Sequence, residues 1–305
     1  MANSAIIFPE LVNGITLGAI YALISLGYTM VYGVLLMINF AHSEIVMAGA
    51  FFGLFLLSFF LKFTFFQNNL LLLLTSVFLL SMCVSGILGA AIERLAYRPL
   101  RKTNRLMPLI SAIGVSLFLQ NLFMLTLSPE AKPYPSVFPA VNFQLGAVTI
   151  NSIQIFIIII SILFMVALEY FVNRTKLGVA IKATSSDIET AKLMGINTNS
   201  IISLVFFIGA ALGGVAGILV GMYYGSIKYN MGFTYGIKAF TAAVLGGIGN
   251  IPGAMLGGFM LGILESLGAA YISSAYKDVF AFIILILVLI FKPTGLLGER
   301  AQDKC

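Results

Sequence analysis

Charged residues are scarce in this sequence of 305 residues, and only 9% of its positions are Asp, Glu, Lys or Arg. Soluble domains carry about 25% charged residues. Hydrophobic residues make up 60% of the chain, and the mean hydropathy is +1.06. This balance excludes a soluble globular protein and predicts a polytopic integral membrane protein whose outer surface is largely covered by the lipid bilayer. The formal net charge of +6 does not indicate nucleic-acid binding, because the basic residues gather in loops, as membrane orientation requires.

Cysteine and histidine are too rare for the sites that they usually form. Cys83 and Cys305 lie far apart in the sequence, so we expect no disulfide. His42 is the only histidine, which excludes a multi-histidine metal site. The GxxxxGK[ST] run that binds ATP phosphates is missing. We therefore expect no catalytic residue, no metal and no cofactor in this chain, and any ATP that drives it must bind another subunit.

The apolar stretches predict an all-α helical bundle, a single transmembrane domain over residues 1–305. Full spans are expected at about 11–33, 45–61, 70–92, 107–127, 152–172, 201–224 and 279–291. A further stretch, 240–268, is interrupted by GGIGNIPG, whose glycines and proline end a helix. It is predicted as a broken helical hairpin rather than a phosphate-binding loop, because it lies inside an apolar segment. Glycines recur every four residues from Gly209 to Gly221, which predicts a face for close helix packing.

The basic residues predict the orientation of the bundle. Twelve of the seventeen Lys and Arg residues fall in the segments 94–105, 174–192 and 292–304. Short cytoplasmic loops are enriched in basic residues, so these three segments are predicted inside. The proline-containing segment 128–151 and the segment 225–238 are then outside. This parity predicts an external N-terminus and an internal C-terminus.

The segment 177–197 is polar and carries charges of both signs, so it cannot lie in hydrocarbon cheaply. It is predicted to form a short surface helix that Ser186 or Asp187 caps, with Glu189 in the first turn, where the helix dipole favours acidic side chains. Gly195 ends this helix, as a glycine in the left-handed region would.

One face of this predicted helix is apolar. Ile188 and Ala191 lie three residues apart and share it, and Gly195 falls near it. Two interpretations remain open: an ordinary amphipathic loop helix, or a docking element that fits a groove on a cytoplasmic partner.

A second polar cluster interrupts the apolar run before residue 45. Asn39, His42, Ser43 and Glu44 either form an interfacial turn among lipid headgroups or line and gate a pathway, since ionisable residues at membrane depth are costly. Glu265 is an isolated acid in an apolar run, and is either buried and paired or near the external surface. Gln120 and Asn121 are interpreted as interhelical hydrogen-bonding residues rather than ligands of a substrate.

Several stretches in order along the chain resemble the shorter permease subunit of LIV-type bacterial ABC importers for branched-chain amino acids. They are NGITLGAIYALISLGYTMVYGVLLMINFAHSE (13–44), ATSSDIETAKLMGIN (183–197), IGAALGGVAGILVGMYYG (208–225), KAFTAAVLGGIGNIPGAMLGG (238–258) and LVLIFKPTGLLG (287–298). NFAHSE departs from the family's NFAHGE form at Ser43, which is expected to alter that turn modestly.

The resemblance implies one set of site residues. The cytoplasmic coupling loop, about residues 173–200, would contact an ATPase through Asp187, Ile188, Glu189, Ala191 and Gly195. A second set comes from the polar cluster and the helix break: we expect a translocation pathway or gate to include Asn39, His42, Glu44, Gly249 and Asn250.

The resemblance also implies partners and a function. The chain would be a multi-pass protein of the bacterial inner membrane, joined to a second, homologous permease subunit and two ATPase subunits that bind ATP and Mg. An external binding protein would deliver leucine, isoleucine or valine for import by alternating access, and the chain itself would not be an enzyme. Two alternatives stay open: the same machine carrying urea or short-chain amides, and a secondary transporter or channel that works alone.

Overall fold

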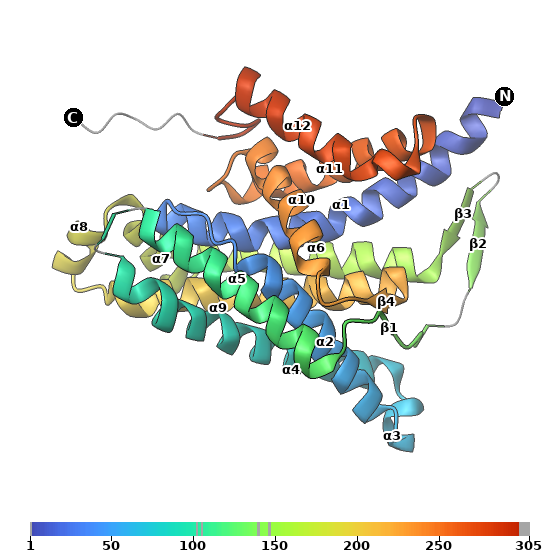
Figure 1. Cartoon of the computed structure of the whole chain (residues 1–305), viewed down its shortest axis with the longest axis horizontal. Helices are drawn as coiled ribbons and strands as arrows, with labels where there is room; N and C mark the ends of the chain where they lie inside the picture. The colour runs from blue at the N-terminus through green and yellow to red at the C-terminus, as the bar shows by residue number, and fades with distance from the viewer. Residues whose placement is uncertain (1, 102, 105, 139–140, 146–147, 299–305) are drawn as a thin grey trace.

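The computed structural model describes residues 2–101, 103–104, 106–138, 141–145 and 148–298, which form a helical bundle (Figure 1). The long helices are α1 (Ala2–Leu35), α2 (His42–Phe60), α4 (Leu70–Ile92), α5 (Leu106–Leu127), α6 (Ser152–Arg174), α9 (Thr198–Tyr224), α10 (Met231–Gly246), α11 (Ile251–Tyr271) and α12 (Lys277–Phe291). The short elements are α3 (Thr64–Gln67), α7 (Lys176–Ser186), α8 (Ile188–Leu193), a π-helical turn (Glu93–Tyr97), two 3-10 turns (Arg98–Leu100 and Ser274–Tyr276) and strands β1 (Lys132–Pro133), β2 (Asn142–Leu145), β3 (Val148–Asn151) and β4 (Ser226–Ile227).

Within the described residues, seven helices are long and apolar enough to cross a membrane. The prediction of a polytopic all-α bundle is therefore confirmed. The assignment of individual spans differs at the C-terminal end. The predicted full span 279–291 corresponds to α12, which has only 15 residues, whereas α11, expected as half of a broken hairpin, has 21 residues and is long enough to span.

The start of α10 corrects a second prediction. The segment 225–238 was expected to be a polar external segment, yet α10 begins at Met231 and Lys238 is buried within it. A lone charge predicts exposure, but Lys238 forms an ion pair with Glu265 of α11 inside the bundle. Burial of a charge is tolerated when an opposite charge accompanies it.

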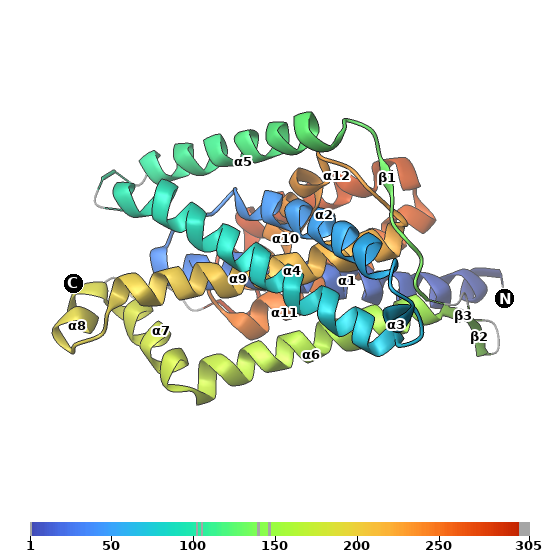
Figure 2. The same cartoon turned by 90° about the horizontal axis from the view of Figure 1, so that it is seen from below.

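Helix α9 occupies the centre of the bundle, where it packs against α1, α2 and α4 (Figure 2). The predicted glycine face makes this packing possible. A Cβ atom at Gly217 would overlap the carbonyl oxygen of Val46 in α2, and one at Gly209 would lie 3.2 Å from the carbonyl oxygen of Gly27 in α1. Small residues let helix backbones approach closely, so the prediction of a close-packing face is confirmed.

Helices α1 and α11 pack along each other through glycines on both sides. A Cβ at Gly18 would lie 2.7 Å from the Cα of Phe259, and one at Gly14 would lie 2.7 Å from the Cα of Ile263. Helices α5, α6 and α12 lie at the periphery and expose many large apolar side chains. In a membrane protein such faces contact lipid or other apolar helices.

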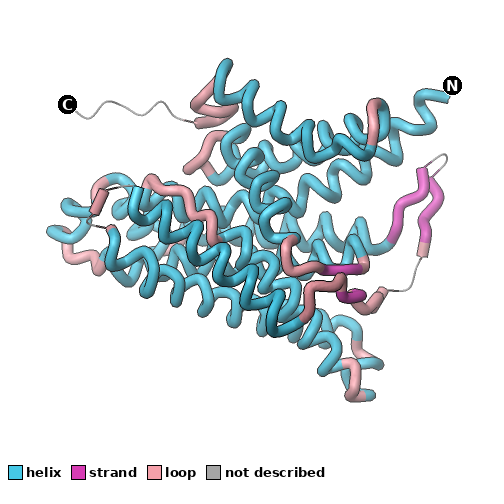
Figure 3. The backbone as a smooth tube through the Cα atoms, viewed as in Figure 1, coloured by secondary structure: helices cyan, strands magenta, loops and turns pink. Residues whose placement is uncertain are grey.

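Strands are confined to the short segments that join the helices (Figure 3). β1 pairs antiparallel with β4, and β2 pairs antiparallel with β3. The segment 128–151, expected to be a loop, thus contains a small hairpin. β2, β3 and the start of α1 lie at one end of the long axis, whereas α7 and α8 lie at the other (Figure 1).

Candidate functional site

The chain reverses direction sharply after α1. Leu36 adopts a φ of 52°, in the left-handed region that few residues other than glycine enter. The segment Met37–Ala41 then returns into the bundle, and α2 begins at His42 among buried side chains. The polar residues that the sequence singled out therefore lie at the start of a helix inside the protein.

Asn39 is held by a partner from a distant part of the chain. The Tyr97 hydroxyl donates a hydrogen bond of 2.8 Å to Asn39 Oδ1, and both side chains are buried. This bond ties the segment before α2 to the π-helical turn that follows α4.

His42 is packed into a space that two glycines leave open. Its ring meets the Tyr28 ring edge-on, with centroids 4.8 Å apart. A Cβ at Gly27 would overlap the His42 ring, and one at Gly213 would lie 3.1 Å from its Cε1. His42 Nε2 is buried and has no hydrogen-bond partner in the described part of the chain.

Glu44 lies in the first turn of α2, and its side chain is almost fully enclosed, at 1% exposure. Oε1 accepts a hydrogen bond of 3.2 Å from Ser116 Oγ, which is halfway along α5. Oε2 is buried, and none of the described residues hydrogen-bonds it. Glu44 is thus enclosed by the chain's own helices.

A cavity of about 430 Å³, which we call the Glu44 cavity, lies between α1, α2, α5 and α10. Its polar lining is supplied by Ser43, Glu44, Ser116 and Gln120. Apolar side chains form most of the rest: Phe40, Ile113, Leu117, Phe233, Ile237 and Phe240. Gln120, interpreted as an interhelical hydrogen-bonding residue, therefore faces this cavity. The arrangement suits a small molecule with an apolar body and one polar end.

Gly249 and Asn250 lie at the break between α10 and α11. Gly247 and Gly249 have φ values of 109° and 96°, which only glycine adopts readily. Asn250 Oδ1 caps α11 by accepting a hydrogen bond of 3.1 Å from Gly253 N, and its Nδ2 donates one of 2.8 Å to the Leu297 carbonyl. The predicted helix break is confirmed.

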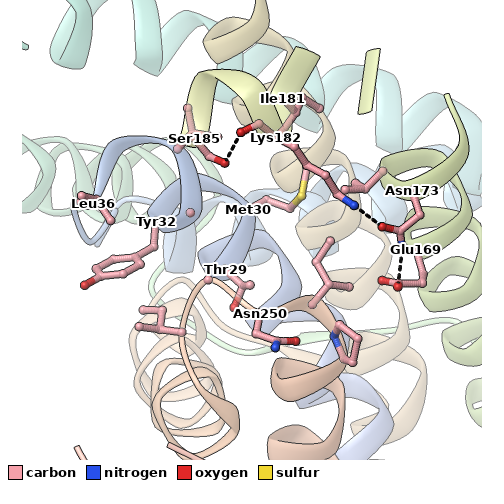
Figure 4. Close-up of a pocket in the computed structure, with 17 residues that line it drawn as sticks. Thr29, Met30, Tyr32, Leu36, Glu169, Asn173, Ile181, Lys182, Ser185 and Asn250 are labelled. Atoms are coloured by element: carbon pink, nitrogen blue, oxygen red, sulfur yellow. Dashed lines mark hydrogen bonds between the residues drawn. The ribbon is translucent and has the colours of Figure 1, made fainter. Parts of the chain in front are cut away.

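This break lines a second cavity of about 480 Å³, which we call the Asn250 cavity. Figure 4 shows Lys182, Asn173 and Glu169 joined by hydrogen bonds on one side, and Asn250 and Thr29 nearby. The predicted pathway residues thus fall into two places rather than one. Asn39, His42 and Glu44 lie around the Glu44 cavity or beside it, whereas Gly249 and Asn250 line the Asn250 cavity. Helix α1 contributes to both, because Tyr28 lines the first and Thr29 the second.

The predicted coupling helix is present as α8. Asp187 Oδ1 accepts a hydrogen bond of 2.9 Å from Glu189 N, so Asp187 is the N-cap, and Gly195 follows the helix with a φ of 83°. A separate helix, α7, precedes α8 and is capped by the Thr175 hydroxyl. The sequence predicted only one helix in this segment.

The apolar face of α8 differs from the expected one. Ala191 is buried against the chain's own bundle, and Ile188 is half-buried. The exposed apolar side chains are instead Leu193 at 87% and Met194 at 78% exposure. The spacing of Ile188 and Ala191 identifies a shared face, and the docking interpretation of this helix stays a prediction.

A buried charged cluster joins the last three helices. Lys238 Nζ lies 2.6 Å from Glu265 Oε1 and 2.6 Å from Asp278 Oδ1, and it lies 5.8 Å from the centre of the Tyr21 ring. Of the two interpretations of Glu265, the buried and paired one is confirmed. The sequence reading missed Lys238, although a lysine in a largely apolar stretch, opposite an isolated acid, is a usable signal.

Another buried acid, Glu93, lies in the π-helical turn after α4. It is paired with Arg101 and accepts a hydrogen bond of 2.5 Å from Ser203 Oγ in α9. Arg101 also donates to Asn199 Oδ1 at 3.2 Å. Part of the basic segment 94–105 is thus fixed to the start of α9, close to α8.

Known proteins resemble this chain along nearly its whole length. A family profile described as "Branched-chain amino acid transport system / permease component" matches residues 10–289. The high-affinity branched-chain amino acid transport system permease protein BraD of Pseudomonas aeruginosa is 49% identical over 97% of this chain and 97% of its own length. The permease protein LivH of the corresponding system in Escherichia coli K12 is 45% identical, over 97% of this chain and 96% of its own.

Two further matches have lower sequence identity. A probable LivH permease of Methanocaldococcus jannaschii is 29% identical over 90% of this chain and 88% of its own. Among solved structures, PsaBC from Streptococcus pneumoniae in complex with Fab matches with a TM-score of 0.41 and 15% identity over 96% of this chain and 92% of that one, and it carries no argument about function. The profile match and the extent of identity to BraD and LivH decide the family: the chain belongs to the permease components of branched-chain amino acid transport systems.

Proposed function

We propose that this chain is a transmembrane permease subunit of a binding-protein-dependent ABC importer that moves leucine, isoleucine and valine into the cytoplasm. The observation that carries the proposal is the identity of 49% to BraD over 97% of both chains. The absence of a phosphate-binding GxxxxGK[ST] run supports a division of labour in which separate ATPase subunits bind ATP and Mg. A second permease subunit, homologous to this one, and a periplasmic binding protein complete the proposed machine.

The proposed orientation has the N-terminus outside and the C-terminus inside the bacterial inner membrane. The distribution of basic residues supports it, because the segments 94–105 and 174–192 are rich in Lys and Arg. The hydrogen bond from Arg101 to Asn199 supports a common side for these segments. The coupling loop, about residues 173–200, then faces the cytoplasm.

In the proposed mechanism, α8 transmits ATPase movements to the spans. Leu193 and Met194 supply exposed apolar contact area, and Glu189 and Lys192 supply charges beside it. Asp187 and Gly195 define where this helix begins and ends, and Ile188 and Ala191 attach it to the bundle. The closing of the ATPases would alter the relative stability of outward-open and inward-open states, since only a partner with different affinities for two states shifts their equilibrium.

The proposed pathway uses both cavities. The Glu44 cavity lies beside Asn39 and His42, and the Asn250 cavity borders the coupling loop, with Lys182 in its lining. A solute moving inward would pass from the first to the second along α1. Helix α9 contacts α1 and α2 through glycines, so no long side chains interlock at these contacts. This favours sliding of α9 against α1 and α2 between the outward-open and inward-open states.

Transport in a reconstituted system tests the proposal. The chain is purified with the second permease subunit and ATPases of its own genome, placed in proteoliposomes and supplied with the binding protein. We expect uptake of labelled leucine that requires ATP and the binding protein and that isoleucine and valine inhibit. Uptake of urea or acetamide instead of leucine would assign the machine to amides. Leucine uptake without ATPases would identify a stand-alone transporter.

A charge reversal at the coupling loop tests the proposed docking. Glu189→Lys alters a side chain that is 83% exposed, so the permease should insert normally. We expect loss of ATPase co-purification and of leucine uptake together. Glu130→Gln, on the exposed segment after α5, serves as the control and should change neither. Full uptake with normal ATPase co-purification in Glu189→Lys would make α8 an ordinary loop helix.

A further inference from the structure

The carboxylate of Glu44 is only half satisfied within the protein. Ser116 donates one hydrogen bond to Oε1, whereas Oε2 is buried with no partner in the described part of the chain. An ionised oxygen without a hydrogen-bond partner is costly inside a protein. This cost is removed when a positively charged donor enters the space beside it. Glu44 Oε2 is therefore a buried acceptor that a cationic donor would satisfy.

The backbone of helix α10 packs directly against the start of α2. A Cβ at Gly232 would lie 2.7 Å from Glu44 Oε2, and one at Gly236 would overlap the Ser43 side chain. The two glycines are one helical turn apart, so they form one face toward Ser43 and Glu44. Gly236 also lines the Glu44 cavity, and a larger residue there would push α10 away from Ser43.

The remaining walls are apolar and aromatic. Phe40 and Phe240 pack with ring centroids 6.4 Å apart, and Leu117 and Ile113 of α5 face them across the cavity. A volume of about 430 Å³ is within the range of small-molecule sites. The walls offer a branched aliphatic group a surface free of competing charge.

We propose that the Glu44 cavity binds the transported amino acid within the permease, with its ammonium group on Glu44 and its branched side chain against the Phe40–Phe240 wall. Gln120, in the same lining, supplies amide N–H donors for the carboxylate of the amino acid. This inference rests on the proposed function and deepens it, since it names the chemical group by which the permease itself recognises its cargo. Urea and short-chain amides lack an ammonium group and would leave Oε2 unpaired.

An acyl chain of a membrane lipid is the competing occupant. It would fill the apolar part of the cavity, but it has no donor for Glu44 and would leave the buried oxygen without a partner. An ammonium group satisfies the same oxygen and gains a charge-assisted hydrogen bond, which is roughly twice as strong as a neutral one. The geometry therefore favours a cationic head on a branched apolar body.

The first test separates charge from shape at position 44. Glu44→Gln keeps the size of the side chain and an oxygen that Ser116 can still bond, but it removes the negative charge. In proteoliposomes we expect leucine uptake to fall roughly 10- to 100-fold, the scale of one lost charge-assisted hydrogen bond. We expect the loss to appear as a higher apparent KM for leucine, which a merely structural role would not predict. Glu130→Gln is the matched control, and Glu44→Asp should retain part of the uptake.

The second test measures occupancy of the Glu44 cavity directly. Ile113→Cys is introduced after Cys83 and Cys305 are replaced by serine, and labelling by a maleimide is followed in the purified complex. We expect leucine and isopentylamine, which both carry an ammonium group, to slow labelling. 4-Methylpentanoate, which has the leucine skeleton without the amine, should not. Adding Glu44→Gln should abolish the protection by leucine.

The outcomes distinguish this inference from the proposed function. Absence of leucine uptake by the unmodified complex would refute the proposed function. Normal leucine uptake by Glu44→Gln, with the unmodified complex active, would overturn the ammonium site alone. Equal protection by leucine and 4-methylpentanoate would assign the cavity to apolar chains and also overturn it.

Discussion

Lys238 of α10 and Glu265 of α11 form an ion pair inside the bundle, with Lys238 Nζ 2.6 Å from Glu265 Oε1. Asp278, at the start of α12, is a second acceptor for the same ammonium group at 2.6 Å and is half exposed. The ion pair thus joins the two halves of the broken hairpin, and Asp278 attaches α12 to them. In a bundle with so few charges, these contacts fix the relative positions of three consecutive helices.

The two members of this pair should differ in their sensitivity to mutation. Lys238→Met leaves Glu265 buried without a counter-charge, and we expect it to destabilise the protein by about 3–5 kcal/mol. Glu265→Gln should cost less, because Lys238 keeps Asp278 as a partner. The measurement is the apparent Tm of the purified protein in detergent, with Lys228→Met, at an exposed lysine, as the control. Equal losses in both variants would contradict the role given to Asp278.

Two glycines should respond in opposite directions to alanine. A Cβ at Gly217 would overlap the Val46 carbonyl oxygen of α2, so Gly217→Ala must separate two helices and should cost about 1–3 kcal/mol. A Cβ at Gly114 in α5 meets nothing within 4 Å, so Gly114→Ala should be neutral or stabilise by about 0.5–1 kcal/mol through helix propensity. Thermal unfolding of both variants checks this. A similar Tm change in the two would show that α2 and α9 are not in such close contact.

The cap of the proposed coupling helix can be removed by a single substitution. Asp187→Ala deletes the acceptor for Glu189 N and should destabilise α8 by about 1 kcal/mol. Asn is an equally good N-cap, so Asp187→Asn should restore it. Amide hydrogen exchange over residues 188–193 measures the loss of structure, and ATPase co-purification measures its effect on docking. Faster exchange with both substitutions would show that charge, rather than the cap, holds the helix.

The hydrogen bond between Tyr97 and Asn39 should stabilise the segment before α2. Tyr97→Phe leaves Asn39 Oδ1 buried without its donor, and we expect a cost of about 1–3 kcal/mol in stability. Tyr170→Phe, at an exposed tyrosine of α6, is the matched control and should change little. The apparent Tm of the two variants is compared in the same detergent. An unchanged Tm for Tyr97→Phe would mean that a water molecule replaces the lost donor.

Local signals in the sequence predicted features that depend only on nearby residues. The glycine-rich break before α11 follows from backbone conformations that glycine alone adopts readily, and Gly247 and Gly249 do adopt them. The cap of α8 follows from the preference of Asp for a helix N-terminus, and Asp187 is that cap. The glycine spacing in α9 likewise predicted a close-packing face. Each of these features lies within a few residues of its cause.

Contacts between distant residues could not be predicted in the same way. Ser116 and Glu44 are 72 positions apart, and Lys238 and Glu265 are 27 apart. The sequence showed Lys238 only as a charge, and charge suggested the exterior. The surroundings of α8 are a similar case, because the spacing of Ile188 and Ala191 does not say whether the bundle or a partner covers them.

Hydropathy and local motifs were therefore enough to predict a bundle of membrane-spanning helices, the limits of most of those helices and the family that the chain resembles. A backbone in hydrocarbon must satisfy its hydrogen bonds within each helix, so hydropathy and capping residues suffice for that much. Only the tertiary structure decided that Glu44 faces a cavity and that Lys238 is buried. Those outcomes depend on which helices pack together, and the free energy of a buried charge is set by partners that the folded chain brings within hydrogen-bonding distance.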